Sequence, residues 1–287
     1  MTYTQASLDH PFLAPLQDIP TPPSKLYLSG QLPDCQPQRP KCVAVIGSRK
    51  YSSYGHRIAY EIASQLASLG VVIISGLAYG IDTIAHRACL DVGGITIAVL
   101  GTSLSSIYPR RHLGVAQELA KTGALLSEYA ADDPFYPTNF LARNRIISGL
   151  ADAIVVVEAA EHSGTLSTAS HALAQGRELF AVPGDLGRPT SIGCLKLIEQ
   201  GAHVYRSTDE LLSIIDPHHK RRSPVTYHGQ DLLAQKIISL LQSGYNDGDQ
   251  ITLELKLSPA VFNQKISLLE LNNVVHALGN NKWALAC

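Results

Sequence analysis

VAVIGSRKYSSYG, residues 43–55, is the stretch of sequence that decides the fold. Its four apolar residues at 43–46 stop at Gly47 and fit a strand that is buried on both faces. Residues 54–69, which follow, carry apolar side chains at helical spacing. A strand that enters a helix through a glycine turn is typical of a doubly wound parallel sheet, so we expect an α/β fold of this type.

The turn after this strand predicts an anion site. Ligands of open α/β sheets lie beyond the carboxyl ends of the strands, where unpaired backbone N–H groups and a helix N-terminus favour anions. The turn consists of Gly47, Ser48, Arg49 and Lys50, whose two basic side chains add positive charge. We therefore expect residues 47–50 to contact phosphate.

The same alternation of strand and helix continues over residues 42–216. We expect strands at 43–47, 71–75, 95–100, 124–127, 153–157, 179–182 and 202–204. We expect helices at 54–69, 81–91, 112–121, 139–150, 166–175, 192–199 and 208–215. Strands separated by helices of this length predict one parallel sheet with helices on both faces.

Three further regions flank this large domain. Residues 1–41 are rich in proline and predict a lead-in that packs on the large domain and contributes an edge strand, since proline cannot donate to a sheet ladder. Residues 217–224 include the basic run HHKRR and predict a linker. Residues 225–287 change pattern and predict a small winged-helix domain.

This last domain has the helix and hairpin signals of a winged helix but not the charge of a DNA reader. Helices are expected at 231–242, at 252–257 and from Ser258-Pro259 onward, before a hairpin at 274–285. Its charged residues are four lysines and five acids: Lys236, Lys256, Lys265, Lys282, Asp231, Asp247, Asp249, Glu254 and Glu270. Duplex binding depends on phosphate neutralisation, so we expect a protein-interaction or structural role here.

Composition narrows the possible classes of protein. The 287 residues have a formal net charge of −1, so a nucleic-acid partner would need a local basic patch. The five cysteines include no CxxC pair, which predicts neither a disulfide framework nor a zinc site. No apolar run is long enough to span a membrane, and the N-terminus lacks the pattern of a signal peptide. We expect a cytoplasmic protein without membrane contact, metal or cofactor.

Residues suited to ligand contact follow several of the expected strands. They are Gly47-Ser48-Arg49, Ser75–Asp82, Gly101-Thr102-Ser103 and Ser163-Gly164-Thr165, and the basic residues in or after such loops are Arg49, Lys50, Arg110, Arg111, Arg143, Arg145 and Arg188. The carboxyl ends of parallel strands meet at one edge of a sheet, which predicts one positive crevice there. For any single loop, a purely structural explanation is equally good, because tight βα turns require glycine.

The motifs argue against two common nucleotide-binding classes. The first turn is not GxGxxG, and no GxxxxGK[ST] is present, so NAD binding and a P-loop NTPase are both disfavoured. A hydrolase would have acid or base groups available in Asp82, His86, Glu128 and Glu158. None of the four shows the spacing of a nucleophile and its base, and caps of helices or partners of arginines are the alternative roles.

Residues 135–145 are the sharpest local sign of a nucleic acid. Arg143 and Arg145 stand close to the aromatic residues Phe135, Tyr136 and Phe140. Arginines suit a phosphate backbone and flat rings suit unpaired bases, a combination typical of single-strand binding. The alternative is that the aromatics belong to the core and the arginines pair with nearby aspartates.

Nine motifs in order resemble those of the DprA/Smf family of DNA-processing proteins. They are GSR (47–49), SGLAYGID (75–82) with Ala85-His86, TIAVLG (96–101), Tyr108-Pro109, LLSE (125–128), RNRIISGL (143–150), VVEA with SGTL (156–159 and 163–166), AVPG (181–184) and LIEQGA (197–202). The resemblance covers residues 42–216, and the lead-in and the tail resemble the family's as well. It implies an extended Rossmann-like fold and a protein that is not an enzyme.

The resemblance also implies a function and a set of site residues. Members bind single-stranded DNA, form homodimers and load the RecA recombinase onto incoming DNA in natural transformation. The DNA-binding residues expected here are Gly47, Ser48, Arg49, Lys50, Ser75, Gly76, Arg110, Phe140, Arg143, Arg145, Ser163, Gly164 and Thr165. The residues expected at a dimer contact are Leu197, Ile198, Gly201 and Ala202.

One alternative comes from another functional class. Nucleotide-processing phosphoribohydrolases share a related core and carry a GGxGTxxE loop, of which Gly164-Thr165 match here. The position of their catalytic glutamate holds Thr168, so this resemblance is weaker. A transcription regulator that uses the winged helix is disfavoured by the charge balance given above.

Overall fold

The structure, a computed structural model, describes residues 2–216, 219, 231–243, 245–272 and 274–285. The chain divides into two compact units, Met1–His219 and Lys220–Cys287, and each is described by itself. The expected linker, residues 217–224, lies outside the described residues apart from His219.

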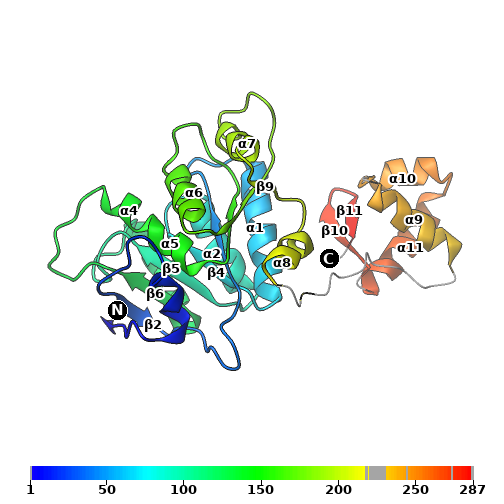
Figure 1. Cartoon of the computed structure of the whole chain (residues 1–287). Coiled ribbons are helices and arrows are strands. Elements are labelled where there is room, and N and C mark those ends of the chain that lie inside the picture. The colour runs from blue at the N-terminus through cyan, green and yellow to red at the C-terminus, as the bar shows by residue number, and fades with distance from the viewer. Residues whose placement is uncertain (1, 217–218, 220–230, 244, 273, 286–287) are drawn as a thin grey trace. The chain divides into compact units, whose positions relative to one another are not determined.

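The large unit is built on one mixed sheet whose strand order is β1-β2-β6-β5-β4-β3-β7-β8-β9 (Figure 1). The strands are β1 (Thr4–Gln5), β2 (Tyr27–Gly30), β3 (Cys42–Ile46), β4 (Val72–Ser75), β5 (Thr96–Leu100), β6 (Ala124–Ser127), β7 (Ala153–Val156), β8 (Glu178–Ala181) and β9 (His203–Val204). In this spatial order, every pair of neighbouring strands from β6 through β5, β4, β3, β7 and β8 to β9 is parallel, and β2 pairs with β6 in the antiparallel sense. The expected α/β fold with a mostly parallel sheet is confirmed.

Helices cover both faces of this sheet (Figure 1). They are the 3₁₀ helices η1 (Pro11–Leu16) and η2 (Arg110–His112), and α1 (Ser53–Ser68), α2 (Ile81–Asp91), α3 (Leu113–Thr122), α4 (Asn139–Ala142), α5 (Asn144–Leu150), α6 (Gly164–Ala174), α7 (Ile192–Glu199) and α8 (Thr208–Ile215). Helices α1, α2, α3 and α8 pack on one face, and η1, α5, α6 and α7 pack on the other.

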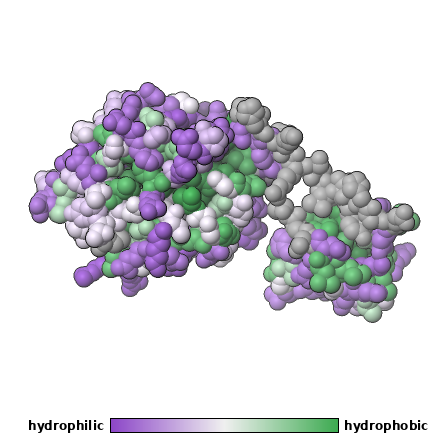
Figure 2. All heavy atoms as spheres, turned by 90° about the horizontal axis from the view of Figure 1, so that it is seen from below, coloured by the Kyte–Doolittle hydropathy of each residue, from purple (hydrophilic) through white to green (hydrophobic). Residues whose placement is uncertain are grey.

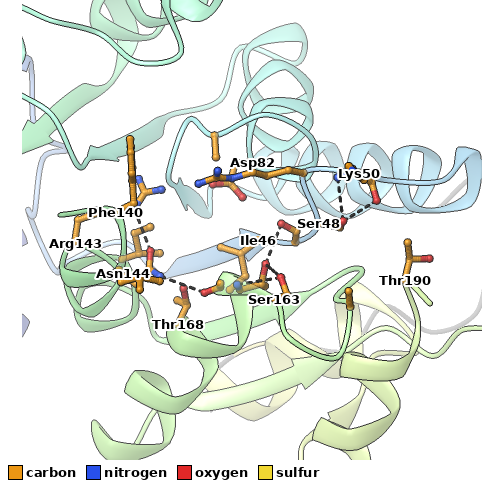
Figure 3. A pocket seen from close by; sticks show the side chains of 18 of the residues that line it. Ile46, Ser48, Lys50, Asp82, Phe140, Arg143, Asn144, Ser163, Thr168 and Thr190 are labelled. Carbon is orange, nitrogen blue, oxygen red and sulfur yellow. Dashed lines mark hydrogen bonds between the residues drawn. The ribbon is translucent and has the colours of Figure 1, made fainter. Parts of the chain in front are cut away.

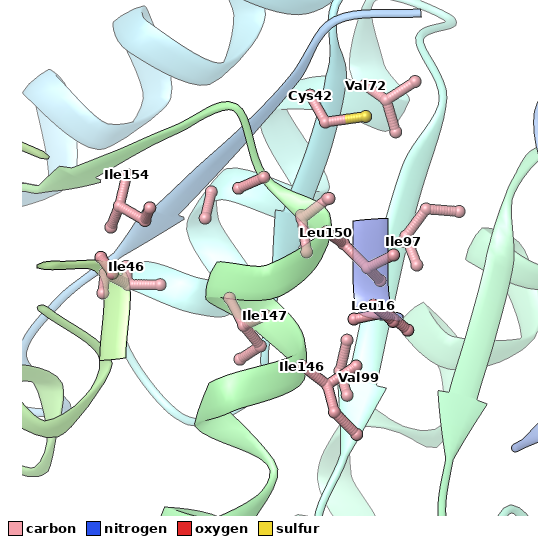
Figure 4. Close-up of a cluster of buried hydrophobic side chains, with 14 of the residues drawn as sticks. Leu16, Cys42, Ile46, Val72, Ile97, Val99, Ile146, Ile147, Leu150 and Ile154 are labelled. Carbon is pink, nitrogen blue, oxygen red and sulfur yellow. The ribbon is translucent and has the colours of Figure 1, made fainter. Parts of the chain in front are cut away.

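The two-residue period of the strands divides the core between these faces. On β5, Ile97 and Val99 point toward η1 and α5, whereas Ala98 and Leu100 point toward α3. Figure 4 shows Ile97 and Val99 near Leu16 of η1 and Ile146 of α5. The lead-in therefore supplies part of the main core, because Leu16 is buried in it together with its neighbours on η1.

Two elements differ from the expectation. A single helix was expected at 139–150, but the chain forms α4 and α5, which meet at Arg143. The Ile146 N–H bonds the Arg143 carbonyl at 2.9 Å, an i to i+3 turn that separates the two helices. The lead-in contributes two strands instead of one, and β1 forms the edge of the sheet.

The C-terminal unit has three helices followed by a hairpin. These are α9 (Leu232–Gln242), α10 (Gly248–Glu254), α11 (Pro259–Leu271), β10 (Val275–Gly279) and β11 (Lys282–Leu285). Phe262 and Ile266 of α11 are buried in a core of its own with Ile237 of α9. Helix α10 begins earlier than expected because Asp247 caps it, accepting the Asp249 N–H at 2.9 Å.

Within the described residues, no helix is both long and apolar enough to cross a membrane.

Candidate nucleic-acid interface

A pocket of about 560 Å³ opens beyond the carboxyl end of β3, at the centre of the sheet. Nine of the thirteen expected DNA-binding residues line it: Gly47, Ser48, Arg49, Lys50, Phe140, Arg143, Ser163, Gly164 and Thr165. Figure 3 shows Ser48 and Lys50 on one side and Asn144, Ser163 and Thr168 on the other. The loops after β3 and β7 and the start of α5 thus meet at one place, as parallel topology predicts.

Most backbone N–H groups of the turn at residues 47–50, which the sequence offered as anion donors, have partners within the protein. The Ser48 N–H donates to the Glu158 carbonyl at 2.7 Å, and the Lys50 N–H donates to Ser48 Oγ at 3.0 Å. The Gly47 N–H bonds the Asp82 carboxylate. Only the Arg49 N–H of this turn has no partner among the described residues. The turn therefore presents mainly the exposed side chains of Arg49 and Lys50.

The backbone donor of the pocket comes from the N-terminus of α6. Ser163 caps this helix, its Oγ accepting the Thr165 N–H at 3.2 Å, while the Gly164 N–H has no partner in the described part of the chain. Thr165 Oγ1 donates to the Gly47 carbonyl at 3.0 Å, which fixes the helix start beside the turn. An N–H group at a helix N-terminus, with Arg49 and Lys50 opposite, suits a phosphate.

Arg143 lies under the pocket and is only 4% exposed. Its guanidinium donates to the Gly76 carbonyl at 2.7 Å, to the Val99 carbonyl and to Asn144 Oδ1 at 3.1 Å. A Cβ placed on Gly76 would lie 2.2 Å from this guanidinium, so Gly76 makes room for it. Arg143 was expected to contact DNA, but it is buried and its donors bind carbonyl groups at the carboxyl ends of β4 and β5.

Ser75 and Gly76 were also expected to contact DNA, but both are buried. Ser75 is fully buried, and its Oγ donates to the Val45 carbonyl at 2.7 Å. Gly76 is buried as well, and its N–H donates to Asp82 at 3.2 Å. The Ser75 hydroxyl and the Gly76 N–H thus bind groups of the protein next to β4 and do not point to a ligand. Their position at a strand end was a correct signal for the fold and a wrong one for the site.

Asp82 is a buried carboxyl group on the floor of the same pocket. Burial raises the pKa of Asp82. The positive charge of Arg143 and the N–H groups of Ala78, Gly76 and Gly47 oppose this rise. Burial also lowers the pKa of Arg143 to about 10, which leaves the guanidinium protonated at neutral pH. The charge of Arg143 thus favours the ionised form of Asp82 against the effect of burial.

Arg145 is also engaged within the protein. Its two terminal nitrogens bond the Glu128 carboxylate at 2.6 and 2.7 Å, and both side chains are largely shielded from water. This bidentate pair uses the donors that a DNA phosphate would need. The sequence alternative expected the arginines here to pair with Asp132, Asp133 or Asp152. Arg145 is paired, but its partner is Glu128.

Exposed aromatic rings continue the pocket on one side. Phe140, Tyr108 and Phe135 form a cluster with ring centroids 5.5, 5.6 and 6.3 Å apart. Tyr108 is 50% exposed and Phe135 is 54% exposed. The Arg49 guanidinium lies over the Phe140 ring, 5.8 Å from its centroid. Charge and flat apolar surface therefore adjoin, but the arginine beside the rings is Arg49 and not the expected Arg143 or Arg145.

The four candidate acid and base groups all have structural partners. Glu158 accepts from Ser52 N at 2.9 Å and Ser52 Oγ at 2.6 Å, which places it at the N-terminus of α1. Asp82 and Glu128 are engaged as described above. His86 Nδ1 lies 2.7 Å from Thr96 Oγ1 inside the core. Thr168, at the position of the phosphoribohydrolase glutamate, lines the pocket without a carboxylate.

The other expected sites are placed as follows. Arg110 is exposed on η2 and lines a separate cavity next to the aromatic cluster. Of the expected dimer residues, Leu197 is buried in the core of its own chain, while Ile198 and Ala202 pack partly against that core. Gly201 is exposed beside the edge strand β9. Leu197 is therefore corrected to a core residue, and the rest of the dimer contact remains a prediction.

Several pocket residues were not predicted, notably Asn144, Ala160, Pro189 and Thr190. Pro189 and Thr190 follow β8, so the strand-end rule used for the other loops could have found them. Asn144 donates to the Gly164 carbonyl at 3.4 Å and gave no signal of its own in the sequence. Among the described residues, no group of three His, Cys, Asp or Glu side chains is placed to hold a metal ion.

A family model described as DNA recombination-mediator protein A matches residues 3–216. The chain belongs to this family. The match covers the large unit, including the lead-in, the pocket and the aromatic cluster. This DprA/Smf membership agrees with the family resemblance of the nine motifs.

Curated DprA/Smf proteins are similar over the same region. Protein Smf of Escherichia coli (strain K12) is 48% identical over 191 residues, which are 66% of this chain and 50% of that protein. DNA processing protein DprA of Bacillus subtilis (strain 168) is 39% identical over 206 residues, 72% of this chain and 68% of that protein. The chain thus spans about half the length of the Escherichia coli relative.

Two solved DprA structures share the fold. DprA from Streptococcus pneumoniae gives a TM-score of 0.67 at 36% identity and covers 74% of each chain. DNA processing protein A from Helicobacter pylori, studied for its single-stranded DNA binding mode, gives a TM-score of 0.68 at 32% identity. That match covers 77% of this chain and 98% of the other.

Proposed function

We propose that this DprA/Smf protein binds single-stranded DNA in the pocket beyond β3 and on the aromatic cluster beside it. The observation that carries the proposal is the position of Arg49, which lines the pocket and lies over the ring of Phe140. A phosphate at the pocket and a base on the neighbouring rings would be held by one continuous surface. Such a surface suits unpaired bases, because a duplex keeps its base faces stacked inside.

The charge near this surface is local. Arg49, Lys50 and Arg110 are exposed and line the pocket or the cavity beside the rings, although the whole chain has a net charge of −1. Arg143 and Arg145 are engaged inside the protein and do not add to it. We therefore expect a moderate number of phosphate contacts and a clear salt dependence of binding.

In the cell, this activity would serve DNA processing. Family membership and the DprA relative whose single-strand binding mode has been studied support this role. We propose that the protein is not an enzyme, that it protects incoming single strands in transformation and that it passes them to the RecA recombinase. A homodimer through the region of Ile198, Gly201 and Ala202 is part of the same proposal.

The C-terminal unit is proposed to be a winged helix that contacts protein. Its order of three helices and a hairpin supports the assignment. Leu232, Leu253 and Leu271 are all more than 70% exposed, and Figure 2 shows hydrophobic residues at the surface of this unit among hydrophilic ones. Exposed leucines with few basic residues suit a protein partner better than a phosphate backbone.

Replacing Arg49 tests the assignment of the pocket. We expect Arg49→Ala to weaken single-strand binding and to reduce the slope of log K against log salt by about one unit, as for one lost phosphate contact. Fluorescence anisotropy with a labelled oligonucleotide at several salt concentrations measures both. Arg87→Ala, an exposed arginine on α2, is the matched control and should change neither. Equal loss in the two variants would show that Arg49 acts only through net charge.

A further inference from the structure

A second cavity of about 420 Å³ lies on the other side of the aromatic cluster. Tyr108, Phe135 and Tyr129 give it aromatic walls, and Asn139 gives it an amide group. Arg110 is exposed on its lining, and its guanidinium makes no hydrogen bond or ion pair within the described residues. The cavity lies within the size range of small-molecule sites and combines apolar walls with a few polar groups, as such sites do.

We propose that this cavity receives one nucleobase of the bound DNA strand. The inference rests on the proposed function, since the strand must first lie on the pocket beyond β3. It adds that the strand continues across the aromatic cluster and turns a second base inward. The protein would then hold a strand at two built sites, with the exposed rings between them.

The linings of the two cavities are connected by residues that are neighbours in sequence or in space. Phe140 lines the first pocket, and the preceding residue, Asn139, lines the second cavity. Tyr108 lines the second cavity, and its ring centroid lies 5.5 Å from that of Phe140. Phe140, Tyr108 and Arg49 also line a small hollow between the two. A strand leaving the first pocket over Phe140 therefore meets Tyr108 and then the second cavity.

An unpartnered hydroxyl points to a polar ligand in this cavity. Thr102 lines it and is 7% exposed, and its Oγ1 has no hydrogen-bond partner in the described part of the chain. Buried hydroxyl groups are normally paired, and one left alone costs stability. A base edge presents both donors and acceptors, so it can satisfy this hydroxyl, whereas an apolar ligand cannot.

Charge at the cavity fits a nucleotide unit. The Arg110 guanidinium suits the phosphate next to an inserted base. Asp133 also lines the cavity, but it accepts the Ala130 N–H at 2.6 Å and lies 3.8 Å from Lys25, so its charge is partly balanced. A free nucleotide and a base of a bound strand share this chemistry, and oligonucleotide length distinguishes them.

The test blocks the opening of the cavity with a large side chain. Ser106 is exposed and lines the cavity, so Ser106→Trp should block it without disturbing the core. Ser105→Trp is the matched control, because Ser105 is exposed next to it but does not line the cavity. Anisotropy is measured for both variants and for the parent protein with oligothymidylates of increasing length, from the dinucleotide upward. Thermal melting checks that all three proteins fold alike.

The expected result is a length-dependent loss. Ser106→Trp should bind the shortest oligonucleotides like the parent protein and longer ones about tenfold more weakly, since one base contact is lost. An abasic position in the long oligonucleotide should weaken binding of the parent protein and leave binding by Ser106→Trp unchanged at the same position. Free thymidine monophosphate, tested alone, should bind Ser106→Trp and the parent protein equally, because the cavity takes a base of a bound strand.

Thr102→Val gives an independent readout. Removing an unpaired hydroxyl at constant shape should keep or raise the melting temperature, yet it should weaken binding of long strands. A merely structural role of Thr102 would move both quantities in the same direction.

Two outcomes would overturn the proposal and differ from each other. If Ser106→Trp binds every length like the parent protein, the cavity takes no base, while single-strand binding at the first pocket stands. If the parent protein binds no single strand at all, the proposed function fails together with this inference.

Discussion

Arg49 and Arg143 line the same pocket but act differently. Arg49 is exposed and reaches over Phe140, whereas Arg143 is buried and spends its donors on the backbone carbonyls of Gly76 and Val99. An exposed arginine can meet a phosphate at little cost to the fold. The buried Arg143 stabilises the shape of the pocket, since it binds carbonyl groups at the ends of two strands.

Arg143→Ala should therefore unfold the protein more easily. The two carbonyls would lose their partner and Asp82 its neighbouring positive charge, which should lower the free energy of unfolding by about 3 kcal/mol or more. Urea titration followed by circular dichroism measures this, with Arg87→Ala as a control that should stay within about 0.5 kcal/mol. A variant as stable as the parent protein would contradict this structural role of Arg143.

His86 should make stability depend on pH. Burial, with the positive charges of Arg143 and His112, lowers the pKa of His86 to about 3. The folded protein keeps this ring neutral, while the unfolded chain protonates it below about pH 6.5. Protons thus favour the unfolded state, and stability is lost as pH falls from about 6.5 toward 3. Between pH 7 and pH 5 the loss from this group should be about 2 kcal/mol.

His86→Asn tests this effect, since its amide can still donate to Thr96 but cannot take up a proton in this range. Its free energy of unfolding should fall less steeply than that of the parent protein between those two pH values. His56→Asn, at an exposed position on α1, should leave the slope unchanged. Parallel curves for the parent protein and His86→Asn would contradict the assignment of a neutral buried histidine.

At the scale of elements, the segment from Pro134 to Ala142 supplies rings on which bases would stack, whereas Arg49 would supply the contact with phosphate. This segment carries Phe135 and Phe140, whose rings meet Tyr108 of another loop. Ring stacking is not ionic and does not release counterions, whereas an arginine contact does. The two kinds of contact should therefore respond differently to salt.

Phe140→Leu keeps an apolar side chain beside Gly101 but removes the flat ring. We expect it to weaken single-strand binding by about 1 kcal/mol or more, with the salt slope unchanged. Tyr60→Ala, an exposed aromatic on α1, is the control. Fluorescence anisotropy at several salt concentrations measures both the affinity and the slope of log K against log salt. A reduced slope in Phe140→Leu would mean that the ring acts only by positioning Arg49.

Most elements of the large unit could be predicted from the sequence. Apolar runs such as 124–127 gave the strands, because buried parallel strands need apolar residues on both faces. The location of the site could be predicted, since the carboxyl ends of parallel strands meet at one edge of the sheet. It was not predictable which arginines face water, because Arg49, Arg143 and Arg145 look alike in the sequence. Burial of Arg143 depends on the space above Gly76, and only the packed fold shows that space.

At the scale of the whole molecule, the proposed DNA surface lies within one unit. The pocket, the aromatic cluster and the second cavity all belong to residues 46–190, and the unit Met1–His219 has its own core. The C-terminal unit has a separate core around Phe262. Binding to a short single strand should need only the first unit.

A chain that ends after His219 should therefore fold and bind short oligonucleotides with an affinity within about twofold of the full chain, as expected for independent parts. Its salt slope should be unchanged. The separate fragment 220–287 should not bind. If removal of the C-terminal unit reduces the slope, that unit contributes phosphate contacts despite its charge balance.

The most direct test compares single-stranded and duplex DNA of equal length. Labelled oligonucleotides are titrated with the full-length chain at two salt concentrations, and anisotropy gives the dissociation constants. The pocket and the exposed rings predict tighter binding of the single strand at both concentrations, weakened by salt. Equal binding of the two forms, or no binding of either, would contradict the central claim that this surface holds unpaired DNA.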